Sequence, residues 1–116
     1  LMHADPGTWQ TLMDWCADVT GAFLRAQVLA GTSAVQLFDS WAGALSLADY
    51  EAHVAPASRR ALSHVADLDV PVVHFGTGTG ELLVAMRDVG ADVVGVDHRI
   101  PLDEANRRLG GRTPLQ

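Results

Sequence analysis

The sequence predicts an α/β fold in which parallel strands alternate with helices. Short runs of apolar, β-branched residues recur along the chain, each run ends in a polar or small-residue turn, and capped helical patterns fill the intervals. Successive strand–helix–strand units with short connections require parallel pairing and right-handed crossovers. We expect about three parallel βα units, with residues 1–116 forming a single piece of a domain truncated at both ends, since the chain starts at Leu1.

The composition excludes several classes of function. With 48% hydrophobic and 19% charged residues the chain is globular. A net charge of -6 and the absence of lysine leave no basic stripe for nucleic acid. No apolar run approaches the ~20 residues of a membrane span, and no signal peptide is apparent. The lone Cys16 fits a reducing compartment, so we expect a soluble protein with Cys16 as a structural thiol.

The first helix is predicted to begin at Asp5-Pro6 and to end at Gly31. Asp5 supplies an N-cap oxygen, and proline at the first helical position loses no hydrogen bond. Apolar residues then recur at steps of three and four and mark one face: Trp9, Leu12, Met13, Cys16, Val19, Phe23, Ala26 and Ala30. We interpret the three tryptophans, Trp9, Trp15 and Trp41, as packing residues.

A strand predicted over residues 34–39 leads into the candidate binding loop. It changes at Asp39 and Ser40 from apolar residues to a polar, small-residue turn that reaches Gly43. In sheets of parallel strands, ligands bind at the carboxyl ends of the strands. The spacing alone leaves two interpretations open, a ligand site or a loop in which Asp39 acts as a cap and Ser40 begins a turn.

The remaining elements are predicted from caps, proline and glycine. Ser46 with Asp49 resembles a capping box, and Pro56 divides the helical stretch that follows, with Arg59 and Arg60 in solvent. The expected order is a helix to Val54, a helix over 56–68, a strand over 70–75, a helix over 81–89, a strand over 92–97, a helix over 101–109 stopped by Gly110, and the start of a strand at 113–116.

The glycine loop Gly76–Gly80 permits more than one interpretation. It lies between a strand and a helix, and Asp97 ends the next strand 21 residues after Gly76, where a ribose-binding carboxylate would stand. It resembles motif I of S-adenosylmethionine-dependent methyltransferases, although His74 and Phe75 stand where these usually carry an acidic residue. A tight turn and an anion site on the helix N-terminus are the other possibilities.

Several segments together resemble the uroporphyrinogen decarboxylase family, in the same order and over nearly the whole chain. They are Gln36–Gly43, Leu45-Ser46, Ala48–Tyr50, Val54–Pro56, Arg59-Arg60, Val73–Gly76, Gly78–Gly80, Gly90–Asp97, Pro101–Ala105 and Leu115-Gln116. Ordered agreement of this extent is far more specific than one glycine loop, so we favour this resemblance over the methyltransferase.

The resemblance implies a (β/α)₈ TIM barrel, of which this chain would supply about three strands. It implies a cytoplasmic homodimer that removes the four acetate carboxyls of uroporphyrinogen III stepwise to give coproporphyrinogen III in haem biosynthesis, without metal or organic cofactor. Family members stabilise a protonated pyrrole with an aspartate and hold substrate carboxylates with arginines, as a developing cation and a polyanionic substrate require.

Carried over by position, the resemblance makes Ser40 a hydrogen-bond donor to a substrate carboxylate and Phe38 part of the pocket wall. It places His74 near the barrel mouth, where it could contact the substrate, although a histidine in an apolar strand can equally be a core residue with its hydrogen bonds satisfied. The catalytic aspartate, arginines, tyrosine and late histidine of the family fall outside this sequence, so no catalytic residue is predicted within it. His98 departs from the tryptophan usual there, and neither Asp39 nor Asp97 is assigned a catalytic role. No residue pair shows specific metal-ligand spacing.

Overall fold

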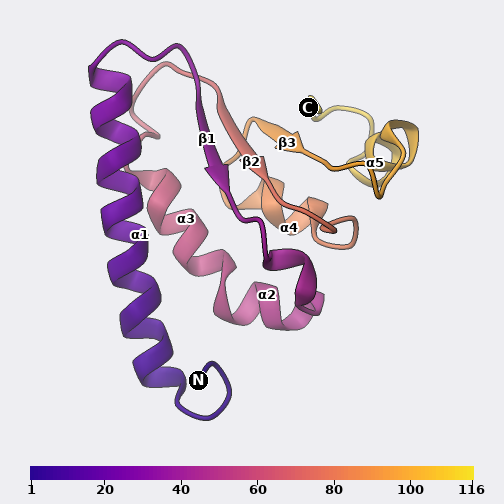
Figure 1. Ribbon diagram of the computed structural model, residues 1–116. Helices are drawn as coiled ribbons and strands as arrows, with labels where there is room; N and C mark the ends of the chain where they lie inside the picture. Colours follow the sequence, from indigo (N-terminus) through magenta and orange to yellow (C-terminus); the bar gives the residue numbers. More distant parts are fainter.

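A computed structural model describes all of residues 1–116 (Figure 1). It contains three strands and six helical segments. In chain order these are α1 (Pro6–Leu29), β1 (Val35–Phe38), the 3₁₀ turn η1 (Ala42–Ala44), α2 (Leu47–His53), α3 (Ala55–Ser63), β2 (Val72–Phe75), α4 (Leu83–Asp88), β3 (Val93–Gly95) and α5 (Leu102–Arg108).

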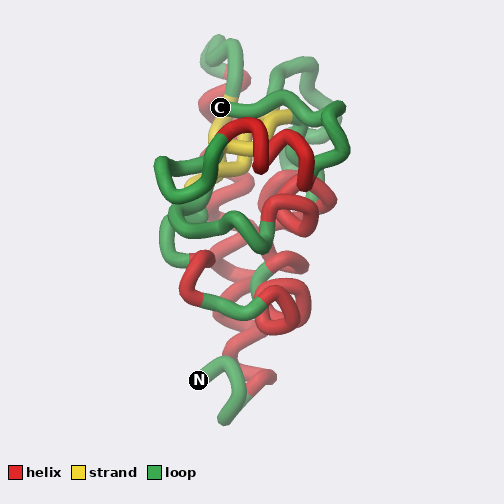
Figure 2. The backbone as a smooth tube through the Cα atoms, turned by 90° about the vertical axis from the view of Figure 1, so that its right-hand side faces the viewer, coloured by secondary structure: helices red, strands yellow, loops and turns green.

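The strands form one parallel sheet in the order β1-β2-β3. Phe38 of β1 pairs with Phe75 of β2, which pairs in turn with Gly95 of β3. Beyond β3, Leu115 forms a parallel bridge with Val94, so the predicted strand start at the end of the chain is present as a single bridge. Figure 2 shows these last residues beside the strands, whereas residue 1 lies at the far end of the molecule. Strands that each pair with the next in sequence confirm the predicted βα units.

The helices cover one face of the sheet. Val35, Leu37 and Val72 point to this face and pack in one apolar cluster with side chains of α1, α3 and α4, such as Leu24 and Met86. The alternate residues of the strands, including Phe38 and Phe75, point to the other face and are incompletely buried. A sheet with helices on one face only is the arrangement of a TIM barrel, whose inner face is covered by its own strands, rather than of a doubly wound sheet.

The predicted caps are present in the structure. Asp5 accepts a hydrogen bond from the Thr8 amide at the start of α1 (3.1 Å), and Ser46 accepts one from the Asp49 amide at the start of α2 (3.1 Å). Gly110 follows α5 with φ of +74°, a conformation that favours glycine. Side chains that satisfy free helix-end amides therefore fix where these helices begin.

Several elements are shorter than predicted. Helix α3 ends at Ser63 rather than at residue 68, because the next amides bond to carbonyls three residues back, as in Val65 to Leu62 and Leu68 to Val65. Strand β3 covers only Val93–Gly95, and the Asp92 carboxylate accepts a hydrogen bond from the Val72 amide across the strand start. In the tight turns after Ser63, apolar residues keep nearly the same spacing as in a helix. The spacing of apolar residues therefore does not distinguish such turns from a helix.

Arg59 and Arg60 are both exposed, as predicted, but Arg60 also forms an ion pair that the sequence did not reveal. Its Nε donates to Asp18 Oδ1 of α1 at 2.7 Å, and Nη2 donates to Oδ2 at 2.8 Å. The Arg60 guanidinium holds the pKa of Asp18 below its ordinary value. This ion pair joins α1 to α3 where small residues, Ala17, Ala57 and Ala61, let the two helices pack closely.

The interpretation of the three tryptophans as packing residues holds for Trp9 and is wrong for Trp15 and Trp41. Trp9 packs on the core and its indole donates to the His53 carbonyl at 2.9 Å, but Trp15 is 65% exposed and Trp41 is 88% exposed. Trp15 belongs to an exposed apolar stripe on α1 that consists of Leu12, Trp15, Val19 and Phe23. None of the helices has the combination of length and hydropathy that a bilayer crossing requires.

Because this stripe and the outer edge of β1 are uncovered, the polypeptide of residues 1–116, made alone, is expected to self-associate. Replacing Trp15 and Phe23 by glutamine should weaken that association, which sedimentation velocity measures over a concentration series. Leu102→Gln is the matched control, since Leu102 is equally exposed but lies on α5. A polypeptide that stays monomeric at every concentration contradicts the expectation.

Candidate functional site

The loops that follow the three strands meet at one edge of the sheet. The Thr77 hydroxyl of the loop after β2 donates to the Ser40 carbonyl of the loop after β1. The Asp97 carboxylate, which follows β3, accepts a hydrogen bond from the Gly78 amide at 3.0 Å. The strand-end loops are thus tied to one another in the order of the strands.

Gly43 permits the contact between the first two loops. A Cβ added at this position would collide with the Thr77 carbonyl and would lie 2.7 Å from the Gly78 carbonyl carbon. Backbone atoms cannot move aside as a flexible side chain can. The small residue therefore allows the Ser40 loop to rest directly on the glycine loop.

Gly43→Ala is expected to lower the free energy of unfolding by about 1–3 kcal/mol, the usual cost of forcing an extra carbon into a packed place. It should also displace Ser40, because the Thr77 hydroxyl could no longer reach the Ser40 carbonyl. Urea unfolding measures the loss. Gly7→Ala is the matched control, since its added Cβ would be 3.7 Å from the nearest atom at the start of α1. Equal stability of the two variants would show that the close approach is not required.

Ser40 and Phe38 are both exposed at the end of β1, as a ligand-binding role requires. No hydrogen bond of the structure uses the Ser40 hydroxyl, while the Ser40 carbonyl is fixed by Thr77. Phe38 is 66% exposed on the helix-free face and stacks edge to face on Phe75, with ring centroids 5.8 Å apart. An aromatic wall beside a free hydroxyl offers apolar contact and one hydrogen bond to the same ligand.

His74 lies beneath this loop and has no exposed surface. Its Nδ1 is 3.0 Å from the Met86 carbonyl, which can only accept, so Nδ1 carries a proton. Its Nε2 faces Asp39 Oδ2 at 3.5 Å, and neither atom has another hydrogen-bond partner. The ring thus lies between α4 and the carboxylate at the base of the Ser40 loop.

Tyr50 of α2 is a further buried polar residue, and the charge of Asp39 acts on it. The side chain is fully buried and its hydroxyl lacks a partner within the chain. Burial raises the pKa of the Tyr50 phenol well above its ordinary value, and the negative charge of Asp39 raises it further. The phenol therefore stays protonated and able to donate. The burial of the Tyr50 hydroxyl could not be predicted from the sequence, because it depends on how α2 packs against the rest of the chain.

The glycine loop and Asp97 are occupied by contacts within the chain. Besides the Gly78 amide, the Asp97 carboxylate accepts hydrogen bonds from the Arg99 amide and side chain. Burial raises the pKa of Asp97, but these donors outweigh it, and the pKa lies below its ordinary value. Helix α4 begins only at Leu83, so no regular helix N-terminus meets the loop. The structure gives no support to the methyltransferase interpretation, in which Asp97 would bind a ribose.

The largest hollow of the surface lies away from these loops. It has a volume of about 630 Å³ and is lined by residues such as Pro71 and Asp92, at the amino ends of the strands. In barrels of parallel strands, residues at the amino ends of the strands contribute to the stability of the fold, whereas ligands bind at the carboxyl ends. The convergence of Ser40, Phe38 and the glycine loop is therefore a better candidate site than the hollow.

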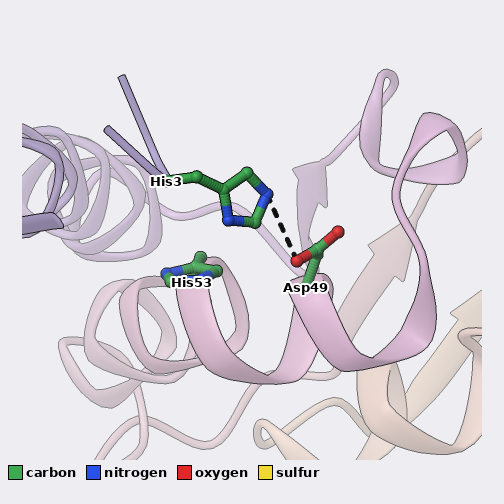
Figure 3. A group of neighbouring side chains, drawn as sticks. All are labelled: His3, Asp49 and His53. Atoms are coloured by element: carbon green, nitrogen blue, oxygen red, sulfur yellow. Dashed lines mark ion pairs between the residues drawn. The ribbon is translucent and has the colours of Figure 1, made fainter. Parts of the chain in front are cut away.

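A second group of polar residues was missed by sequence reasoning, which found no specific metal-ligand spacing. His3, Asp49 and His53 bring their ligand atoms within 4.8 Å of one another (Figure 3). The four-residue step between Asp49 and His53 was the available signal, because residues so spaced share one face of a helix. His3 could not be added from sequence, since its place depends on the turn before α1.

Parallel strands in sequential order, helices on one face and linked loops at the carboxyl ends define a partial TIM-barrel-like βα segment with a strand-end site. The model of the family described as Uroporphyrinogen decarboxylase (URO-D) matches residues 1–116, so this chain belongs to that family. The methyltransferase alternative finds no support in the comparisons.

Curated relatives agree with the family match. The whole chain is 72% identical to a uroporphyrinogen decarboxylase of Arthrobacter sp., 64% identical to one of Leifsonia xyli subsp. xyli and 58% identical to one of Streptomyces coelicolor. It covers 34%, 35% and 33% of these proteins. The chain therefore spans about a third of the length of the curated relatives it matches.

Proposed function

We propose that the protein containing this chain is a carboxy-lyase that converts uroporphyrinogen III to coproporphyrinogen III by stepwise removal of its four acetate carboxyls. The single observation that supports this most strongly is the family match over all 116 residues, with 58% to 72% identity to relatives that carry the name. The free hydroxyl of Ser40 at the carboxyl end of β1 is consistent with a site that binds the carboxylates of this substrate. Residues 1–116 alone are proposed to be inactive, since the family's acids and arginines lie outside them.

In this proposal Ser40 and Phe38 contact the substrate. The Ser40 hydroxyl would donate to a substrate carboxylate, a charge-assisted hydrogen bond. The exposed ring of Phe38, held on Phe75, would pack against a pyrrole. His74 is fully buried, so we assign it the holding of Asp39 beneath the Ser40 loop in place of the direct substrate contact considered from sequence.

The complete protein is proposed to work in the cytoplasm as a homodimer and to need no cofactor or nucleic-acid partner. The family resemblance supports the homodimer and the cofactor-free reaction. The acidic charge of -6 and the lack of lysine argue against binding to a phosphate backbone.

The test is an assay of the complete enzyme with uroporphyrinogen III under anaerobic conditions, with chelator present and no cofactor added. Coproporphyrinogen and intermediates with seven, six and five carboxyls are expected, separated chromatographically after oxidation to porphyrins. The absence of turnover in an enzyme that binds S-adenosylmethionine saturably in calorimetry would overturn the proposal in favour of a methyltransferase.

A further inference from the structure

Three possible metal ligands converge beside α2, a feature that the decarboxylase reaction does not use. Asp49 and His53 project from the same side of α2, and His3 reaches them from the turn before α1 (Figure 3). His3 Nε2 is 3.4 Å from Asp49 Oδ1, and the two imidazoles meet edge to face with centroids 5.4 Å apart. Side chains from two segments, 46 residues apart along the chain, thus present two nitrogens and one oxygen to a common point.

Hydrogen bonds hold the Asp49 side chain and the main chain that carries His3 and His53. The Ser46 hydroxyl donates to Asp49 Oδ2 at 3.0 Å, which leaves Oδ1 to face the histidines. The end of α2 at His53 is fixed by the Trp9 indole, which donates to the His53 carbonyl at 2.9 Å. The turn that carries His3 is closed by the hydrogen bond from the Asp5 amide to the Leu1 carbonyl, at 2.8 Å. Carboxylates that bind metal ions commonly accept a hydrogen bond on the oxygen that does not contact the metal, and this bond fixes their orientation.

We propose that His3, Asp49 and His53 form a binding site for a divalent transition ion of the zinc class. Two imidazoles with one carboxylate suit zinc and its neighbours, whereas calcium and magnesium prefer ligand sets made of oxygen alone. Three protein ligands leave at least one coordination position for water, and His3 is the most exposed of the three. The ion would fasten the segment before α1 to α2.

Binding is tested on the complete enzyme with Zn²⁺ by calorimetry and with Co²⁺ by visible absorption. We expect a cobalt spectrum of nitrogen and oxygen ligands, without a sulfur charge-transfer band. His53→Gln should weaken binding of the ion at least about tenfold, the effect typical of losing part of a metal site. His3→Gln should weaken binding of the ion to a similar degree. Because His3 lies outside α2, this variant tests the site even if the His53 substitution perturbs the helix. Zn²⁺ should also slow hydrogen exchange of the amides in residues 1–8.

His98→Gln is the matched control, because His98 is exposed and lies far along the chain after β3. Cys16→Ser controls for a thiol ligand. Both variants should bind Zn²⁺ as the unaltered enzyme does. Zinc affinity that is the same in the unaltered, His3 and His53 proteins, or no saturable binding in any of them, overturns the proposal. The decarboxylase assay contains chelator, so failure of this site and failure of the proposed activity are distinguishable.

Discussion

Ser40→Ala in the complete enzyme is expected to raise KM for uroporphyrinogen by about 10- to 100-fold. A hydrogen bond to a charged group contributes about 1.5–3 kcal/mol to the free energy of binding, and each 1.4 kcal/mol changes the affinity tenfold. The Ser40 hydroxyl makes no hydrogen bond within the chain, so its removal leaves no buried group unpaired. The melting temperature should therefore be unchanged.

Steady-state kinetics with uroporphyrinogen III measure this effect. Ser63→Ala is the matched control, since Ser63 is an exposed serine of α3 whose hydroxyl donates to the Arg60 carbonyl, away from the strand-end loops. The control should keep the KM of the unaltered enzyme. A Ser40 variant with unaltered KM would remove Ser40 from the binding site.

His74→Leu is expected to lower the free energy of unfolding by about 2–4 kcal/mol. Leucine has nearly the volume of histidine but no ring N–H, so the Met86 carbonyl loses its bond and Asp39 Oδ2 loses its neighbour. A buried polar group left unpaired costs about 1–3 kcal/mol. Turnover should fall as well, because Asp39 lies directly before Ser40 in the loop.

Urea unfolding of the complete enzyme, with the slope of the transition compared as well as its midpoint, measures the loss. His98→Leu is the control at an exposed histidine and should change stability by less than about 0.5 kcal/mol. If the two variants are equally stable, His74 does not hold Asp39 in the way described.

Much of the fold could be predicted because local signals determined it. The apolar runs identified all three strands, and Asp5 and Ser46 identified two helix starts through hydrogen bonds that involve only neighbouring residues. Helix α3 was predicted too long because Val65 and Leu68 continue the apolar pattern after the chain has changed to turns. The spacing of apolar residues indicates which residues are buried, and a buried turn has a spacing similar to that of a helix.

The position of the site could also be predicted, but its internal contacts could not. That Ser40 ends a strand is readable from sequence, whereas the support from Thr77 depends on how two loops pack. The exposure of Trp15 and Trp41 was missed because an aromatic side chain gives no sign of which neighbour covers it. His3 was missed as a partner of α2 because the two segments are far apart in sequence.

The most direct test of the binding role is a crystal structure of the complete enzyme with coproporphyrinogen bound. We expect a product carboxylate within hydrogen-bond distance of Ser40 Oγ, a pyrrole against the ring of Phe38, and His74 still covered beneath the loop. Product bound at the amino ends of the strands, or beyond the reach of Ser40, would contradict this expectation.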